Sequence, residues 1–150
     1  MTKTHFISIY LDMYPLIAGI VSMLVAQIIK SVYFYFKDDH LNLRHVFTAG
    51  GMPSSHSALV GSLTAAIGLQ EGWNSSLFCI CVVFSMIVLY DATGVRRAVG
   101  RQAAILNQIV DDVSHGNFKP KKLTELLGHT PAEVVVGVLL GIGIAFTLYY

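Results

Sequence analysis

Four apolar stretches separated by polar connections dominate the chain, over about 13–36, 57–70, 75–90 and 134–150. The first is long enough to cross a hydrocarbon core of about 30 Å, which takes about 20 helical residues. The other three have 14 to 17 residues, so they either extend into flanking polar residues or cross only in part. The pattern predicts an all-α fold, an integral membrane helical bundle of about four transmembrane helices.

The connection between the third and fourth stretches is long enough to contain structure of its own. Residues 94–110 carry apolar side chains at helical spacing and predict an interfacial or cytoplasmic helix. Residues 111–120 read as a loop around a Gly116-Asn117 turn. Residues 121–127 predict a short helix that ends at Gly128 as its C-cap.

Composition favours a membrane protein over a soluble helical bundle. Of 150 residues, 54% are hydrophobic and 13% are charged, whereas charged residues make up about 25% of a soluble domain. The length predicts one membrane domain over 1–150. The first residues carry one lysine and no small-residue cleavage site, so we expect no signal peptide and keep the first apolar stretch as a helix.

Basic residues in the connections predict the orientation. The first and third connections hold eight Lys and Arg residues, against Lys3 alone on the other side. The positive-inside bias therefore places both connections in the cytoplasm and both termini outside. Every candidate site residue named below then falls at the cytoplasmic membrane face. A net charge of +1 without a basic, aromatic-rich tract excludes a nucleic-acid partner.

His129 and Glu133 open the last apolar stretch. Four residues apart on a helix, they share a face and can touch. A carboxylate on one imidazole nitrogen fixes the tautomer and leaves the other nitrogen free as base or nucleophile. The alternative is structural: Thr130-Pro131-Ala132-Glu133 is a capping box, which explains Glu133 without catalysis but leaves His129 unexplained.

His56 opens the second apolar stretch. Pro53-Ser54-Ser55 predicts a turn whose serines, Ser54 and Ser55, cap the helix and present backbone N–H groups to an anion. A histidine in that first turn would lie beside a phosphate and could protonate a leaving oxygen as imidazolium. The alternative is an interfacial histidine that faces lipid headgroups.

Arg96, Arg97 and Arg101 follow the third apolar stretch, and guanidinium groups bind phosphate bidentately. An aspartate at the end of a span is costly unless paired, so we expect Asp91 to hold one of these arginines or Lys30. The alternatives are arginines that anchor to headgroups and a Lys30 that snorkels to the interface.

Metal binding is not expected. Asp38-Asp39-His40 and Asp111-Asp112-Val113-Ser114-His115 read as solvated loop charges rather than ligand sets. Cys79 and Cys81 lie two apart and face different sides of a helix, so neither a disulfide nor a metal pair is expected. We expect no cofactor.

Two motifs resemble the PAP2 phosphatase superfamily, the type 2 phosphatidic acid phosphatases related to acid phosphatases and vanadium haloperoxidases. Its Pro-Ser-Gly-His corresponds to Pro53-Ser54-Ser55-His56, with Ser55 in place of the glycine. Its His-x-x-x-Asp-Val-x-x-Gly-x-x-Leu-Gly corresponds to the run from His129 through Val134, Gly137, Leu140 and Gly141, with Glu133 in place of the aspartate. The chain as a whole is similar to the divergent PAP2 family, small membrane proteins with Gly-Gly-Met-Pro-Ser-Ser-His-Ser and Asp-Ala-x-Gly-Val-Arg-Arg.

The resemblance implies a metal-independent phosphatase with His129 as nucleophile, Glu133 as its orienting partner and His56 as general acid. The phosphate ligands would be Lys30, Arg96, Arg97 and Arg101. The superfamily's arginine six residues before the nucleophile is Leu123 here, so one of the three arginines would have to replace it. Superfamily membrane enzymes usually have six spans, so we expect a homo-oligomer, a dimer, to complete the fold.

The sequence therefore predicts a lipid phosphatase of the bacterial plasma membrane, with its site facing the cytoplasm. It would hydrolyse a lipid phosphomonoester or diphosphate through a phosphohistidine, among membrane lipids and with an apolar groove for the tail. One alternative is a non-catalytic lipid-binding, scaffold or transport protein that keeps the site. A second is a Mg²⁺-dependent phosphotransferase that uses Asp91.

Overall fold

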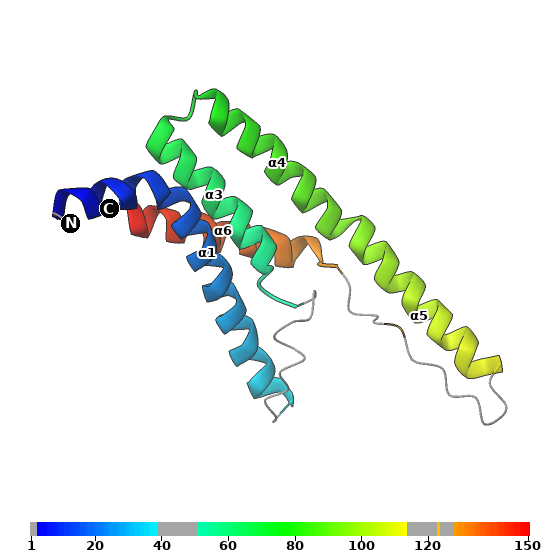
Figure 1. Cartoon of the computed structure of the whole chain (residues 1–150). Helices are drawn as coiled ribbons and strands as arrows, with labels where there is room; N and C mark the ends of the chain where they lie inside the picture. The colour runs from blue at the N-terminus through cyan, green and yellow to red at the C-terminus, as the bar shows by residue number, and fades with distance from the viewer. Residues whose placement is uncertain (1–2, 39–50, 114–122, 124–127) are drawn as a thin grey trace.

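The computed structural model describes residues 3–38, 51–113, 123 and 128–150, and the regular structure in them is helical. The helices are α1 (Lys3–Asp38), α3 (Ser55–Glu71), α4 (Ser76–Thr93), α5 (Val95–Val113) and α6 (Pro131–Tyr149) (Figure 1). Among the described residues, three stretches are long and apolar enough to cross a membrane: Met13–Phe36 in α1, Ser76–Asp111 through α4 and into α5, and Pro131–Tyr149, which is α6. The all-α membrane fold is confirmed in this form.

The helices are longer than the apolar stretches because caps and polar turns extend them. Helix α3 still reaches only 17 residues, so the structure provides three clear candidate spans rather than the expected four. Helix α5 continues to Val113, and the prediction of a loop from Asp111 was wrong by one helical turn. Of the short helix expected over 121–127, all but Leu123 lies outside the described residues.

Helix α3 is the centre of the bundle, in contact with α1, α4 and α6. Small residues make this possible, since helices in lipid associate by close backbone packing rather than by a hydrophobic driving force. A Cβ on Gly141 of α6 would overlap the Ala58 carbonyl of α3, and one on Gly137 would meet the Ser54 carbonyl at 2.5 Å. The Ser54 N–H donates to the Glu133 carbonyl at 3.2 Å, so α3 and α6 begin side by side.

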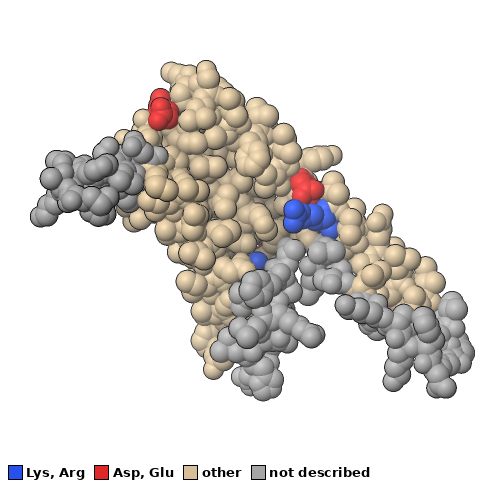
Figure 2. Space-filling view, viewed as in Figure 1, with Lys and Arg blue, Asp and Glu red and all other residues tan. Residues whose placement is uncertain are grey.

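Helices α4 and α5 form one long rod with a break at Gly94 (Figure 1). The backbone hydrogen bonds continue across the break, from Gly94 N–H to Tyr90 and from Ala98 N–H to Gly94. On the face shown in Figure 2 charged side chains are few, and acidic and basic groups lie together near this junction. The rod thus places a charged pair at the end of an apolar helix.

Candidate functional site

His129 and Glu133 touch, as their spacing predicts. The Nδ1 atom of His129 lies 3.2 Å from Oε2 of Glu133, and His129 is only 4% exposed. The same Oε2 accepts the Thr130 N–H at 3.0 Å, while Thr130 Oγ1 accepts the Glu133 N–H at 3.3 Å. The Glu133 carboxylate therefore takes part in the capping box and also contacts the imidazole of His129. Because this contact uses Nδ1, Nε2 of His129 can act as a base or nucleophile.

His129 is also anchored to the far end of α4. Its backbone N–H donates to the Ala92 carbonyl at 3.0 Å. Gly128 makes this approach possible: its φ is +85°, and a Cβ there would overlap the backbone of Arg96 and Arg97. The segment before α6 thus packs directly against the start of α5.

The turn before His56 is a helix cap. Ser54 is the N-cap of α3, and its Oγ accepts hydrogen bonds from the N–H and the hydroxyl of Ser57. Ser54 is fully buried and Ser55 is 8% exposed, so both serines face the bundle. His56 as a whole residue is exposed at this end of α3, although it also lines a partly enclosed pocket, where its ring loses part of its water. The cap fixes where α3 begins and so where the His56 ring lies.

A small pocket joins these elements. Its volume is about 30 Å³, and its lining comes from α3, α4, α5 and the segment before α6: His56, Val88, Asp91, Ala92, Arg96 and His129. Arg96 Nε donates to Asp91 Oδ2 at 2.7 Å, so the arginine that Asp91 holds is Arg96. Two imidazoles and one guanidinium therefore face the same space.

Lys30 lies inside the bundle next to this site. It is 1% exposed, so it does not snorkel to the surface. Its side chain packs near Gly51, whose φ is +94°, in the segment that leads to α3. Its charge acts on Glu133 and on both histidines. The Lys30 amine is therefore close enough to influence both histidines, although it does not line the pocket.

Burial and positive charge act on both imidazoles in the same direction. Burial lowers the pKa of His129 below its usual value; the Glu133 hydrogen bond and charge oppose this, and Lys30 and His56 reinforce it. Loss of water around the ring lowers the pKa of His56, and Arg96 and Lys30 lower it further. Both rings thus favour the neutral form until an anion enters.

The structure brings Lys30, His56, Asp91, Arg96, His129 and Glu133 together. It does not bring Arg97 or Arg101 to the pocket lining, and the Ser54 hydroxyl is committed to its cap. Sequence reasoning missed Ala92 and the close packing of Gly128. The sequence predicted Gly128 only as a helix C-cap, and that expectation of a special backbone conformation was the one signal near this packing.

Among the described residues, no group of three His, Cys, Asp or Glu side chains lies close enough to hold a metal ion. Cys79 is exposed and Cys81 is buried, and both are free thiols. Asp38 ends α1 and Asp111–Val113 end α5, whereas Asp39, His40, Ser114 and His115 lie outside the described residues.

These features define a helical membrane protein with a histidine-lined polar pocket at one end of its apolar helices. Residues 11–144 match the divergent PAP2 family, and the chain belongs to that family. Over 149 aligned residues it is 39% identical to the uncharacterized membrane protein YuiD of Bacillus subtilis (strain 168). The alignment covers 91% of this chain and 94% of the relative. No solved structure matches the chain.

Proposed function

We propose that this protein is a membrane lipid phosphatase that hydrolyses a lipid phosphomonoester or diphosphate at the cytoplasmic interface. The observation that carries the proposal is the contact of buried His129 with partly buried Glu133, 3.2 Å apart, at a pocket that His56 and Arg96 also line. A nucleophile oriented by a carboxylate, with an acid and a cation facing it, is what phosphoryl transfer to histidine requires.

In the first step Nε2 of His129 bonds to phosphorus, while the bond from phosphorus to the leaving oxygen breaks. The electron pair leaves with that oxygen, and the His56 imidazolium gives it a proton. Water then attacks the phosphohistidine, neutral His56 takes a proton from that water, and the P–N electron pair returns to Nε2. The products are the lipid alcohol, or the monophosphate from a diphosphate, and inorganic phosphate.

Arg96 is the proposed replacement for the arginine that the superfamily carries at the position of Leu123. Leu123 is held against α5, because its backbone N–H and carbonyl both bond to the Asn107 side chain at 2.9 Å. Arg96 lines the pocket, and its Nε donates to Asp91, which lines the same pocket. Lys30 supplies a second positive charge toward the developing negative charge.

The test is phosphate release by the purified protein in detergent, with EDTA present, on phosphatidic acid, phosphatidylglycerophosphate and polyprenyl phosphates. We expect release that EDTA does not suppress and that His129→Ala abolishes without changing protein yield. Release lost in EDTA and restored by Mg²⁺ would instead support a phosphotransferase-like use of Asp91. Binding of these lipids without release would support a non-catalytic lipid-binding protein.

A further inference from the structure

A second, larger cavity lies beside the polar pocket, between α3, α4 and α6. Its volume is about 290 Å³. Along α4 its lining residues are Phe78, Val82, Ser85, Met86 and Leu89, which fall on one face of the helix. From Phe78 to Leu89 this face extends about 16 Å at the rise of an α-helix. We call this cavity the apolar groove.

The side-chain hydroxyl groups that line the groove form hydrogen bonds with each other and with the backbone. The hydroxyls of Thr64 and Ser85 lie 2.8 Å apart, and Ser85 Oγ also donates to the Val60 carbonyl. Because these hydroxyl groups bond to one another and to the backbone, the surface that the groove offers to a ligand is apolar. It lies within the apolar length of α4, so its contents come from the hydrocarbon region of the membrane.

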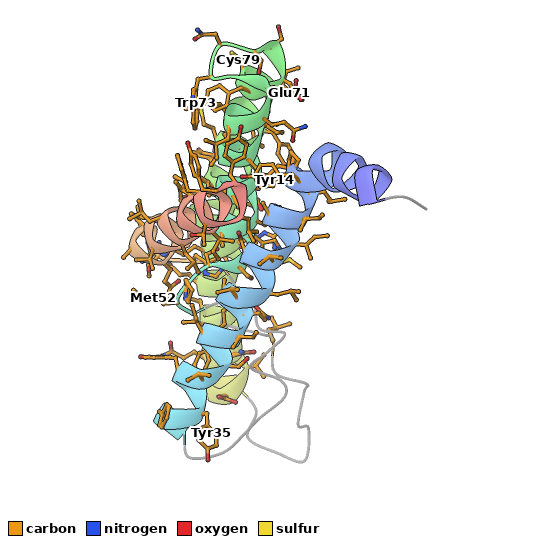
Figure 3. The ribbon with its side chains drawn as sticks, turned by 90° about the vertical axis from the view of Figure 1, so that its left-hand side faces the viewer. Tyr14, Tyr35, Met52, Glu71, Trp73 and Cys79 are labelled. Atoms are coloured by element: carbon orange, nitrogen blue, oxygen red, sulfur yellow. The ribbon has the colours of Figure 1, made fainter. Side chains whose placement is uncertain are left out.

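The two ends of the groove differ. At one end Ser85 and Leu89, which line the groove, lie three residues before Val88 and Ala92, which line the polar pocket, so the two cavities border neighbouring parts of the α4 surface. At the other end stands Trp73, whose ring leaves no room for a Cβ on Gly68 and meets the Phe78 ring edge-on at 5.3 Å. Figure 3 shows Trp73 at the end of the bundle near Glu71 and Cys79, away from Met52 before α3. The groove therefore borders the polar pocket near one end and is bounded by an aromatic ring at the other.

We propose that the apolar groove binds one hydrocarbon chain of the lipid whose phosphate occupies the pocket of His56, Arg96 and His129, and that Trp73 limits the length of that chain. The proposal rests on the proposed function for the position of the phosphate. A volume at the low end of small-molecule sites suits one chain rather than two. The position of the groove next to the polar pocket on α4 is what favours a lipid chain over a second copy of the protein.

Photolabelling tests the groove without any turnover. The probes are straight-chain alkylphosphonates, which cannot lose phosphate, with a diazirine either next to the phosphonate or at the far carbon. We expect the near diazirine to label Val88 or Leu89 and the far one to label Trp73 or Phe78. Labels spread over the outward residues of α4, such as Ile80 and Ile87, would overturn the proposal.

A matched pair of variants gives a second test. Val82→Trp fills the groove, whereas Val83→Trp places the same ring on a residue that is 57% exposed outside it. We expect labelling to fall at least tenfold in Val82→Trp and to stay near wild type in Val83→Trp. Equal losses in both variants, or a change of oligomeric state in Val82→Trp alone, would overturn the proposal, the latter by assigning the groove to a second copy.

Chain-length competition tests the limit at Trp73 and does not depend on the folding of Val82→Trp. Each methylene that enters the groove should tighten binding by about fourfold, since a buried CH₂ contributes about 0.8 kcal/mol. We expect this gain to stop once the groove is full and to continue for longer chains in Trp73→Ala. The same cut-off in both proteins would refute a limiting role. If the groove labels as expected but no lipid releases phosphate, the hydrolysis proposal fails and the chain site stands.

Discussion

The backbone N–H of His129 donates to the carbonyl of Ala92 at 3.0 Å, and this bond joins the start of α6 to the end of α4. Ala92 lies one helical turn before Arg96. The bond therefore fixes the distance between the imidazole and the guanidinium across the pocket. Gly128 permits it, because a side chain at that position would collide with the start of α5.

The first prediction is that Arg96 differs from its neighbours. Arg96→Ala should lower kcat/KM by about 10²–10³, the loss expected for one donor to transition-state charge. Arg97→Ala and Arg101→Ala remove the same charge from residues outside the pocket lining and should retain activity within a few-fold. Phosphate release from the best lipid of the panel is the measurement. Equal losses in all three variants would show a general attraction of the anionic lipid rather than a specific ligand.

The sequence predicted the contacts that depend on spacing within one helix. The His129–Glu133 pair follows from an i,i+4 relation, and the Ser54 cap follows from a turn signal next to an apolar run. The choice of Arg96 among three arginines could not be predicted. It depends on how α5 is rotated after the break at Gly94 and on the packing of Gly128, and neither is local to the arginines.

The number of membrane spans likewise depends on packing between helices, which the sequence pattern does not show. Helix α3 carries enough apolar residues to read as a span, but its 17 residues are enclosed by the other helices. The serines and glycines of α3 allow it to pack closely against α6. The spacing of apolar residues along the sequence does not reveal this packing. Hydropathy therefore located the helices correctly, but it predicted about four membrane spans where the described residues provide three candidates.

The second prediction concerns pH. Attack requires neutral His129 and protonation of the leaving group requires charged His56, so kcat/KM should be bell-shaped, with the two limbs reporting the pKa values of the pair. Burial lowers both pKa values, and positive neighbours lower them further. The optimum should therefore lie below pH 6.5, the usual pKa of histidine. A Lys30→Met protein, which loses one of those positive charges, should have its whole profile displaced to higher pH.

The third prediction separates the two uses of Glu133. Glutamine also serves at the N3 position of a capping box, so Glu133→Gln should keep the thermal stability of the protein. It removes the charge that raises the pKa of His129, so the acidic limb should move to lower pH while activity falls by about 10²-fold or more. Thr130→Ala should do the reverse, with a stability loss of about 1 kcal/mol and little change in the pH profile. Full activity in Glu133→Gln would show that Glu133 is only a cap.

The fourth prediction tests whether α3 and α6 must pack backbone to backbone to form the site. Gly141 has no room for a Cβ because the Ala58 carbonyl occupies that space, whereas nothing lies within 4 Å of a Cβ built on Gly143, half a turn further along the same helix. Gly141→Ala should therefore cost about 1–3 kcal/mol through overpacking. Gly143→Ala should be neutral or stabilising by up to about 1 kcal/mol, because alanine favours the helix. Thermal unfolding in detergent measures both.

The same substitution should affect activity, because α3 carries His56 and α6 follows His129. Gly141→Ala should reduce phosphate release at temperatures where the protein is still folded. A destabilised variant with unchanged activity would show that the two histidines tolerate movement of the helices.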